Sequence, residues 1–346
     1  MNKRTISALL LICLLMPVWC SAAHAEQQAN VQKIFTEAFW EQFDLQTLDE
    51  TSSYSFAVTG NSAYQLMSSG DIYAYDLETG EYALYAHVPA LPKQAYSPGF
   101  KYSELDDETK ALVDGAVFQL IGRIDGDELY GYCLTSGLIG RIDEEGIHWN
   151  EIRLDNSLQM KGNLPWPDSL LDARILGESL YAFYNKAENF DAPCDGVILK
   201  WNLVTGDCQI TEVPGAYALC CTPSEHALLL CMDDEGMIVL RRYDLQTQAM
   251  NQSAESLPIS QTQVEANDQY SVRTLFSGLA WHEDQGLIYF ATPDGLWFCA
   301  ADDENPSRIA LNGNAWDGLN VTSEAWLSKD GSYVLFNGSK YVVTVD

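Results

Sequence analysis

Tyr75-Asp76-Leu77-Glu78-Thr79-Gly80 returns in altered form as Trp201-Asn202-Leu203-Val204-Thr205-Gly206 and as Tyr243-Asp244-Leu245-Gln246-Thr247-Gln248. Each copy continues an apolar run and supplies what a tight hairpin needs. An Asp or Asn side chain can accept hydrogen bonds from the turn backbone, and Gly adopts left-handed conformations without steric cost. A motif that recurs in this way predicts a repeat protein.

A second hairpin pattern recurs between these copies: an apolar run, a polar turn and another run rich in Tyr, Leu and Phe. Six copies have turns near residues 60, 126, 177, 224, 285 and 330. The clearest is Ala325-Trp326-Leu327-Ser328-Lys329-Asp330-Gly331-Ser332-Tyr333-Val334-Leu335-Phe336. The first unit reads as four short strands, at Phe56–Val58, Tyr64–Met67, Ile72–Tyr75 and Tyr82–Ala86.

Four strands in a unit of about 40 to 50 residues are typical of a β-propeller blade. We therefore predict an all-β propeller of six four-stranded blades, with five or seven left open. The last unit ends at Tyr341–Asp346, which reads as a third strand, so the N-terminal segment should supply the fourth and close the ring. We expect that strand within Ile34–Val58; if Tyr54–Val58 supplies it, the blade count shifts. Helical spacing in the same region predicts a short helix that includes Val31, Ile34, Phe35, Ala38 and Phe39.

The N-terminus has the features of a secretory signal peptide. Lys3 and Arg4 precede an apolar run, and Ala23-His24-Ala25 has the small-x-small pattern of a cleavage site. We expect cleavage near Ala25-Glu26, so that residues 1–25 are a leader and 26–346 form one propeller domain, with 26–50 as its closing segment. Trp19 before Cys20 argues against a lipoprotein signal. No later run approaches the length of about 20 apolar residues that a membrane span requires, which predicts a soluble, exported protein.

The hairpins are similar to those of known propeller families. Ser328-Lys329-Asp330-Gly331 resembles the repeat of WD-repeat-like propellers, including the periplasmic propeller of the Tol system. Asp76-x-x-Thr79-Gly80 resembles the repeat of quinoprotein-type and YVTN-type propellers. The chain thus resembles secreted bacterial β-propellers over nearly its whole length after the leader. The resemblance implies an envelope-associated or sugar-like partner, although the repeat lengths are irregular and no unit carries a full family signature.

The chain is strongly acidic. Its 346 residues include 49 Asp plus Glu against 19 Lys plus Arg, a formal net charge of -30 at pH 7. Because phosphate neutralisation needs basic patches, this composition excludes a nucleic-acid partner. It also disfavours an anionic membrane surface. Such acidity can serve solubility, or it can attract cations and basic partners.

The cysteines after the leader are odd in number, so they cannot all pair with one another: Cys133, Cys194, Cys208, Cys220, Cys221, Cys231 and Cys299. Most lie within apolar strand patterns, which predicts buried free thiols. If a disulfide forms, Cys220 or Cys221 with Cys231, across one hairpin, is the easiest pairing.

Linear signatures of catalysis are missing from the sequence. It contains no H-E-x-x-H, G-x-S-x-G, Walker or C-x-x-C pattern. Four histidines, scattered over separate units, lack metal-ligand spacing: His87, His148, His226 and His282. Four acidic stretches in expected turns can gather calcium, but they fit solvated turns better: Asp106–Glu108, Asp125–Glu128, Asp233–Glu235 and Asp302–Glu304. We expect no cofactor, with calcium left open.

Two loops exceed the length that a blade needs, Val88–Gly115 and Asn185–Gly196. A short helix is predicted from Ser103. Long loops on a rigid scaffold often carry binding residues, and aromatic side chains there can stack on a sugar or anchor a protein. The candidate ligand-binding residues are Tyr96, Tyr102, Trp149, Trp166 and Trp316. The alternative is that these side chains pack beneath loops or between blades.

We expect a non-enzymatic module that binds a protein or carbohydrate at the cell envelope, on the face that bears the Val88–Gly115 insertion. Two other functions stay open. One is a carbohydrate-active enzyme that uses carboxylates from neighbouring blades. The other is a quinoprotein-like dehydrogenase, which only the Asp-x-x-Thr-Gly hairpins suggest.

Overall fold

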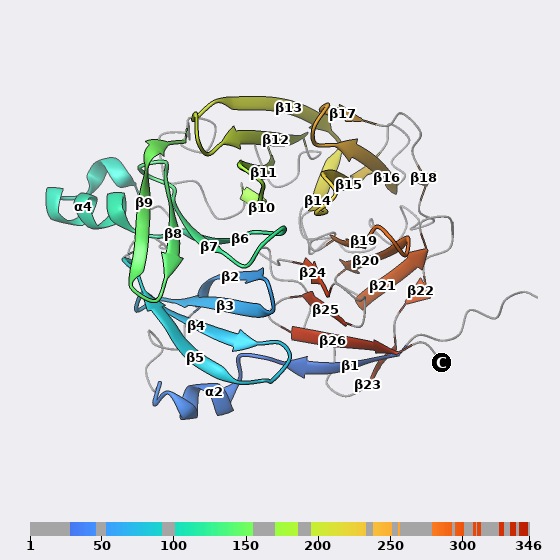
Figure 1. Ribbon diagram of the computed structural model, residues 1–346, viewed down its shortest axis with the longest axis horizontal. Coiled ribbons are helices and arrows are strands. Elements are labelled where there is room, and N and C mark those ends of the chain that lie inside the picture. The colour runs from blue at the N-terminus through green and yellow to red at the C-terminus, as the bar shows by residue number, and fades with distance from the viewer. Residues whose placement is uncertain are drawn as a thin grey trace, which may run out of the picture.

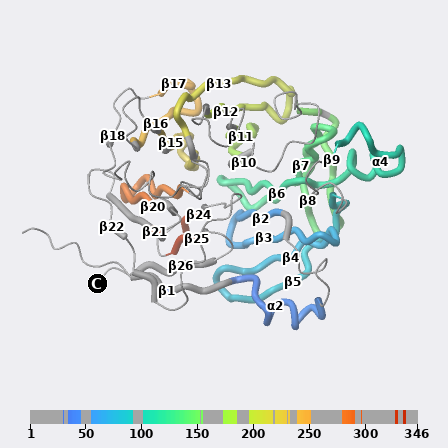
Figure 2. The backbone as a smooth tube through the Cα atoms, turned by 180° about the vertical axis from the view of Figure 1, so that it is seen from behind, coloured from blue at the N-terminus to red at the C-terminus, as the bar shows by residue number. Residues whose placement is uncertain are grey.

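The protein is built from short antiparallel strands arranged around a common centre (Figure 1), as the view from behind also shows (Figure 2). The structure, a computed structural model, describes residues 28–45, 53–91, 101–154, 170–185, 195–232, 238–250, 255–256, 279–292, 295–300, 307–308, 310–312, 325–328, 333–336 and 339–344. These residues hold strands β1 to β26 and helices α2 and α4, and the strands form six sheets.

Four of the sheets contain four strands each, paired antiparallel in chain order. The first sheet holds β2 (Ser53–Thr59), β3 (Ser62–Met67), β4 (Asp71–Asp76) and β5 (Tyr82–His87). The second holds β6 (Gln119–Gly122), β7 (Leu129–Cys133), β8 (Leu138–Asp143) and β9 (Gly146–Arg153). The third holds β10 (Leu170–Leu176), β11 (Ser179–Asn185), β12 (Asp195–Asn202) and β13 (Cys208–Pro214). The β19–β22 sheet holds β19 (Leu279–His282), β20 (Leu287–Thr292), β21 (Gly295–Ala300) and β22 (Ser307–Arg308).

The other two sheets contain five strands each. One holds β14 (Ala216–Cys221), β15 (His226–Met232), β16 (Ile238–Asp244), β17 (Ala249–Met250) and β18 (Glu255–Ser256). The last holds β24 (Ala325–Leu327), β25 (Tyr333–Phe336), β26 (Ser339–Thr344), β1 (Gln28–Lys33) and β23 (Ala310–Asn312). Four-stranded meanders packed side by side are the blades of a propeller. The chain therefore has the all-β, propeller-like arrangement that the repeats predict.

The first strands of successive sheets lie next to one another around the centre (Figure 1): β2 beside β6, β6 beside β10, β10 beside β14, β14 beside β19, and β19 beside β24. Buried side chains fill the spaces between sheets. Leu66 packs with Leu120, Tyr132 with Trp201, and Phe183 with Leu229, within three apolar clusters. A further cluster joins Leu335 of β25 to Val58 of β2. The core is thus a series of layers between neighbouring sheets.

The repeated turn forms as the sequence predicts. In all three copies the side-chain oxygen of the Asp or Asn accepts hydrogen bonds from the N–H groups two and three residues later, over 2.7 to 2.9 Å. The sixth position is left-handed, with φ of 77° at Gly80, 79° at Gly206 and 56° at Gln248. The leucine of each copy donates its N–H to the turn between the first two strands of the same sheet: Leu77 to Asn61, Leu203 to Glu178 and Leu245 to Glu225.

The turn at Asn202 offers a direct test of this arrangement. Asn202→Ala is expected to lower the free energy of unfolding by about 1 kcal/mol, because two backbone N–H groups lose their acceptor. Asn202→Asp retains a side-chain oxygen at the position where Asp76 and Asp244 act. We expect it to stay within about 0.5 kcal/mol of the parent protein. Urea unfolding measures both values, and equal losses in the two variants would contradict the role of the oxygen.

The strand that pairs with β26 lies earlier than we expected. β1 runs antiparallel to β26, with Val31 opposite Tyr341, and parallel to β23. It precedes the Ile34–Val58 range that the sequence suggested, and Tyr54–Val58 belongs instead to β2. Backbone pairing on both sides positions β1. Ala29 and Val31 alternate with polar residues in Gln28–Lys33, but this alternation is too short to identify a strand by itself.

The short helix predicted near Val31–Phe39 begins later, as α2 (Glu37–Gln42). Its buried Phe39 contacts Tyr73 edge to face, with 5.0 Å between the ring centroids. Figure 1 shows α2 beside β4 and β5. The apolar spacing in this segment therefore reflects packing onto the outer strands of the first sheet.

The Val88–Gly115 insertion contains a 3₁₀ turn at Tyr102–Glu104 and α4 (Asp107–Gly115), which Figure 1 shows beside β9. We predicted a helix from Ser103; the α-helix begins four residues later. Asp106 caps it, since its carboxylate accepts the Thr109 N–H at 2.7 Å. No helix in the described part of the chain is long and apolar enough to span a membrane.

Our prediction of a disulfide between Cys231 and either Cys220 or Cys221 is wrong. Cys220 and Cys221 form no disulfide with Cys231. Cys231 lies opposite Ala216, at the other end of the β14–β15 pair, so the strand register separates it from the two neighbouring cysteines. Cys133 and Cys231 are buried free thiols, as predicted. Burial raises the pKa of Cys231 to about 12, which makes this thiol unreactive.

Candidate functional site

Eight hairpin turns from five consecutive sheets are joined by hydrogen bonds into one surface, which we call the turn face. It comprises residues 59–61, 76–81, 123–128, 177–178, 202–207, 222–225, 244–248 and 283–286. Within a sheet, the leucine N–H groups described above join the last turn to the first. Between sheets, side chains make the connections.

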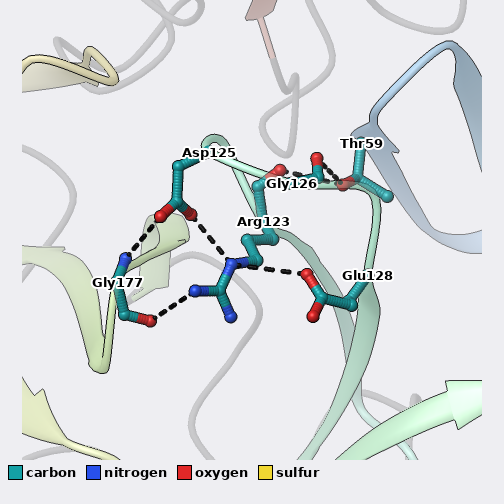
Figure 3. A network of polar contacts seen from close by, with 6 residues as sticks. All are labelled: Thr59, Arg123, Asp125, Gly126, Glu128 and Gly177. Atoms are coloured by element: carbon teal, nitrogen blue, oxygen red, sulfur yellow. Dashed lines mark hydrogen bonds and ion pairs between the residues drawn. The ribbon is translucent and has the colours of Figure 1, made fainter.

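Arg123 joins the first three sheets (Figure 3). Its Nε lies 2.9 Å from Asp125 Oδ1 and 3.3 Å from Glu128 Oε2, and its NH2 group donates to Gly177 O at 2.9 Å. Asp125 accepts the Gly177 N–H at 3.1 Å, so the second and third sheets exchange two polar contacts. Thr59 donates its hydroxyl to Arg123 O at 2.8 Å, which attaches the first sheet. A permanently charged guanidinium thus fixes this part of the turn face.

Lys200 joins the third sheet to the β14–β18 sheet. Its Nζ donates to Leu245 O at 3.2 Å and lies 5.4 Å from the centroid of the Tyr181 ring. The ammonium therefore bridges the turn that follows β16 and an aromatic ring of β11.

Glu283 joins the β14–β18 sheet to the β19–β22 sheet. Its carboxylate accepts hydrogen bonds from Thr222 Oγ1, at 3.0 Å, and from Ser224 Oγ, and it binds His226 Nδ1. Burial would raise the pKa of Glu283, but the hydrogen bonds from Ser224 and His226 outweigh burial and hold this pKa below its ordinary value. Ser, His and Glu are the residue types of a hydrolase triad. Here, however, Glu283 lies between Ser224 and His226, whereas a triad places the imidazole next to the serine.

The turn face is acidic. Its twelve carboxylates belong to Asp76, Glu78, Glu81, Asp125, Asp127, Glu128, Glu178, Asp207, Glu225, Asp244, Glu283 and Asp284. The lysine and arginine side chains that join its described turns are Arg123 and Lys200. Glu78, Glu81, Asp127, Glu178 and Asp284 form no ion pair with a described residue, and all but Glu78 and Glu81 lie in the turns nearest the centre. The surface therefore presents uncompensated negative charge on a fixed framework.

The structure places two of the five predicted binding residues. Trp149 lies in β9, half-buried, and packs against the apolar cluster between the first two sheets. Tyr102 packs beside Leu91 and Val113, under the insertion. Their different clusters do not bring the two side chains together. Tyr96, Trp166 and Trp316 lie outside the described residues.

Tyr102 is anchored at its hydroxyl. The O–H lies 2.8 Å and 2.9 Å from the two carboxylate oxygens of Asp114 at the end of α4. Burial, together with this hydrogen bond and the nearby charge of Asp114, raises the pKa of Tyr102 to about 12. This contact fastens the 3₁₀ turn to α4.

An alkaline titration should release this contact. The folded pKa of Tyr102 lies above the ordinary value of 10.0, so its contribution to stability is complete below pH 10 and is lost as the pH rises towards 12. Tyr102→Phe should remove this loss while lowering stability at neutral pH by about 1 kcal/mol. Limited proteolysis of the insertion at increasing pH measures the effect. A parallel pH profile in the two proteins would be evidence against it.

Two acidic turns have structural partners that the sequence did not reveal. Asp106 caps α4, and Asp125 and Glu128 bind Arg123. Asp233–Glu235 and Asp302–Glu304 lie outside the described residues. Within the described ranges, no group of three or more His, Cys, Asp or Glu side chains is placed to hold a metal ion.

Sequence reasoning missed the carboxylates of the turn face. It expected binding on the opposite face, where the Val88–Gly115 insertion leaves β5 beside the β3–β4 turn. We interpreted the acidic turns one by one as solvated loops. The repeat itself carried the missing signal, because turns at equivalent positions of successive units lie at the same end of their sheets.

Comparison with known proteins gives a fold-level likeness. No family model matches the chain, and no curated protein matches it. Similar solved structures include WD40 β-propeller domains. The WD40 domain of Pan2 from Neurospora crassa is 9% identical, with 93% of this chain and 96% of that chain covered and a TM-score of 0.46. A chain of a mitotic checkpoint complex is 11% identical, with 84% and 86% covered and a TM-score of 0.46.

A third similar structure is the hydrazine synthase of Kuenenia stuttgartiensis, which is 10% identical over 85% of this chain and 96% of that chain, with a TM-score of 0.45. Scores and identities at this level carry no argument about function. The fold rests on the sheets themselves.

Proposed function

We propose that this protein is an exported six-bladed β-propeller that acts as a non-enzymatic binding module and holds a basic protein segment on its turn face. One observation carries the proposal: acidic turns of five sheets are locked by hydrogen bonds into a single negative surface. A preorganised charged surface steers an oppositely charged partner and loses little entropy on binding.

The pairing of β1 with β26 supports a closed ring in the proposal, because it places the N-terminal strand in the last sheet. The cluster that joins Leu335 to Val58 supports contact between the last sheet and the first. Export rests on the signal-peptide pattern at residues 1–25. The carboxylates of the turn face accept hydrogen bonds from turn backbones and neighbouring side chains, bind Arg123 or His226, or form no ion pair with a described residue, which suits binding better than catalysis.

A charge-reversal experiment tests the binding surface. The probe is a fluorescent ten-residue lysine peptide, titrated into residues 26–346. We expect the triple variant Glu78→Lys, Glu178→Lys and Asp284→Lys to bind it at least tenfold more weakly than the parent. Binding of the parent should weaken steeply as salt is added, because screening shortens the reach of surface charges.

The matched control reverses three exposed glutamates elsewhere, Glu41→Lys, Glu108→Lys and Glu151→Lys, with the same change in net charge. It should retain most of the affinity. If both triple variants lose affinity equally, net charge alone attracts the peptide and the turn face is not its site. A glycan panel read by thermal shift tests the carbohydrate alternative, since a ligand of the folded state raises the midpoint.

A further inference from the structure

The connections between sheets on the turn face use several kinds of donor. Thr59 donates a neutral hydroxyl, and Arg123 and Lys200 donate from groups that stay charged at all physiological pH values. His226, which binds Glu283, is the donor whose residue type changes charge between about pH 5 and pH 8. Among the described connections, the joint between the β14–β18 and β19–β22 sheets is therefore the one whose strength depends on pH in that range.

The geometry makes this joint local and specific. His226 begins β15 and Glu283 follows β19, 57 positions apart in sequence, with both side chains at the surface. Thr222 and Ser224 donate to the same carboxylate. Arg242 makes a further contact between these two sheets, because its guanidinium carbon lies 5.5 Å from the centroid of the Trp281 ring.

Several titratable or charged groups surround His226. Asp244 lies directly opposite His226 in the β15–β16 ladder. Backbone hydrogen bonding from Thr247 dominates the lowering of the Asp244 pKa, and the charge of His226 adds to it. The other titratable or charged side chains on the packed elements are Glu225, Arg242, His282 and Asp284. Carboxylates outnumber cations in this set, so negative charge predominates around the contact between His226 and Glu283.

We propose that the contact between His226 and Glu283 is a pH-responsive clamp, which tightens the junction of two neighbouring sheets when the imidazole is protonated and loosens it when the proton leaves. This inference rests on the contact between the β14–β18 and β19–β22 sheets and does not depend on the basic protein segment proposed as the partner. In the protonated state the contact is a charge-assisted hydrogen bond between opposite charges. In the neutral state the same nitrogen can still donate, but without the ionic attraction.

The sign of the effect follows from the two groups. Glu283 stays ionised well below neutral pH because its pKa is lowered, so its share of the clamp is lost only under more acidic conditions. The ionic share of the contact needs a protonated imidazole, so this share is lost as the pH rises and the proton leaves. The junction should therefore be tightest in the pH range where Glu283 is ionised and the imidazole of His226 is protonated.

A double-mutant cycle measures the clamp directly. His226→Gln and Glu283→Gln, alone and together, are compared with the parent by thermal unfolding at about pH 5.5 and at about pH 8. We expect the shifts in midpoint to be non-additive by about 2–4 °C at the lower pH. At the higher pH the non-additivity should fall to less than half. Both replaced side chains are partly exposed, so all four proteins should fold.

The contact between Arg123 and Asp125 supplies the matched control, because its donor keeps its charge. Arg123→Gln and Asp125→Asn, alone and together, should show the same coupling at both pH values. If His226 and Glu283 show equal coupling at both pH values, stronger coupling at the higher pH, or none at the lower, the proposed clamp is overturned. Coupling that varies with pH in both cycles would assign the effect to the whole acidic face and would also overturn it.

Discussion

Gly122→Ala is expected to lower the free energy of unfolding by about 3 kcal/mol, which is the upper end of what one added methyl group costs in a packed interior. Gly122 lies in β6, where this strand passes β2 of the neighbouring sheet. A Cβ atom at this position would lie 2.1 Å from Val58 O and 2.9 Å from the Val58 carbonyl carbon. Both are backbone atoms of a paired strand, so the added methyl group must separate the two sheets.

Gly115→Ala is the matched control for this substitution. A Cβ atom at Gly115, the last residue of α4, would meet no heavy atom within 4 Å. Here alanine should be neutral or stabilise the protein by up to about 1 kcal/mol, since it restricts the unfolded chain. Denaturant midpoints of the two variants decide the matter. A Gly122→Ala protein as stable as Gly115→Ala would show that β2 and β6 do not approach so closely.

The parts of the fold that the sequence predicted are those that depend on interactions between residues close in sequence. The Asp and Asn acceptors of the repeated hairpins act on the next few residues, so their effect is visible in a short window. The same holds for the six paired runs, all of which are antiparallel strand pairs in the structure. The bounds of β1 within the expected closing segment 26–50 were not predicted, because its pairing depends on β26, more than three hundred residues later.

The candidate site was harder to predict from the sequence, because its contacts join residues that are far apart in the chain. Glu283 follows β19 and His226 begins β15, in different sheets, and nothing in the residues around either one indicates the other. Arg123 and Gly177 are separated by 54 positions. The disulfide prediction failed for a local reason: in a hairpin that turns near residue 224, Cys221 lies opposite Ala227 and Cys231 lies opposite Ala216.

The second large effect is expected at Trp201, the aromatic residue of the middle repeat. Its indole is 1% exposed and packs between the second and third sheets with Tyr132 and Leu199. Trp201→Ala should lower the free energy of unfolding by about 3–5 kcal/mol, because it removes buried contacts and leaves a cavity. Chemical denaturation of the variant beside the parent measures this loss.

Trp201→Phe separates packing from hydrogen bonding at this position. The indole Nε1 is buried and has no hydrogen-bond partner among the described residues, so phenylalanine removes a donor that gains nothing from folding. The phenyl ring keeps most of the apolar contact. We therefore expect a loss below about 1.5 kcal/mol, well under that of alanine. Val204→Ala, at a 60% exposed turn position of the same repeat, should change stability by less than about 0.5 kcal/mol. If phenylalanine proves as damaging as alanine, the indole N–H has a partner in solution, and the layer between these sheets is held by a polar contact as well as by packing.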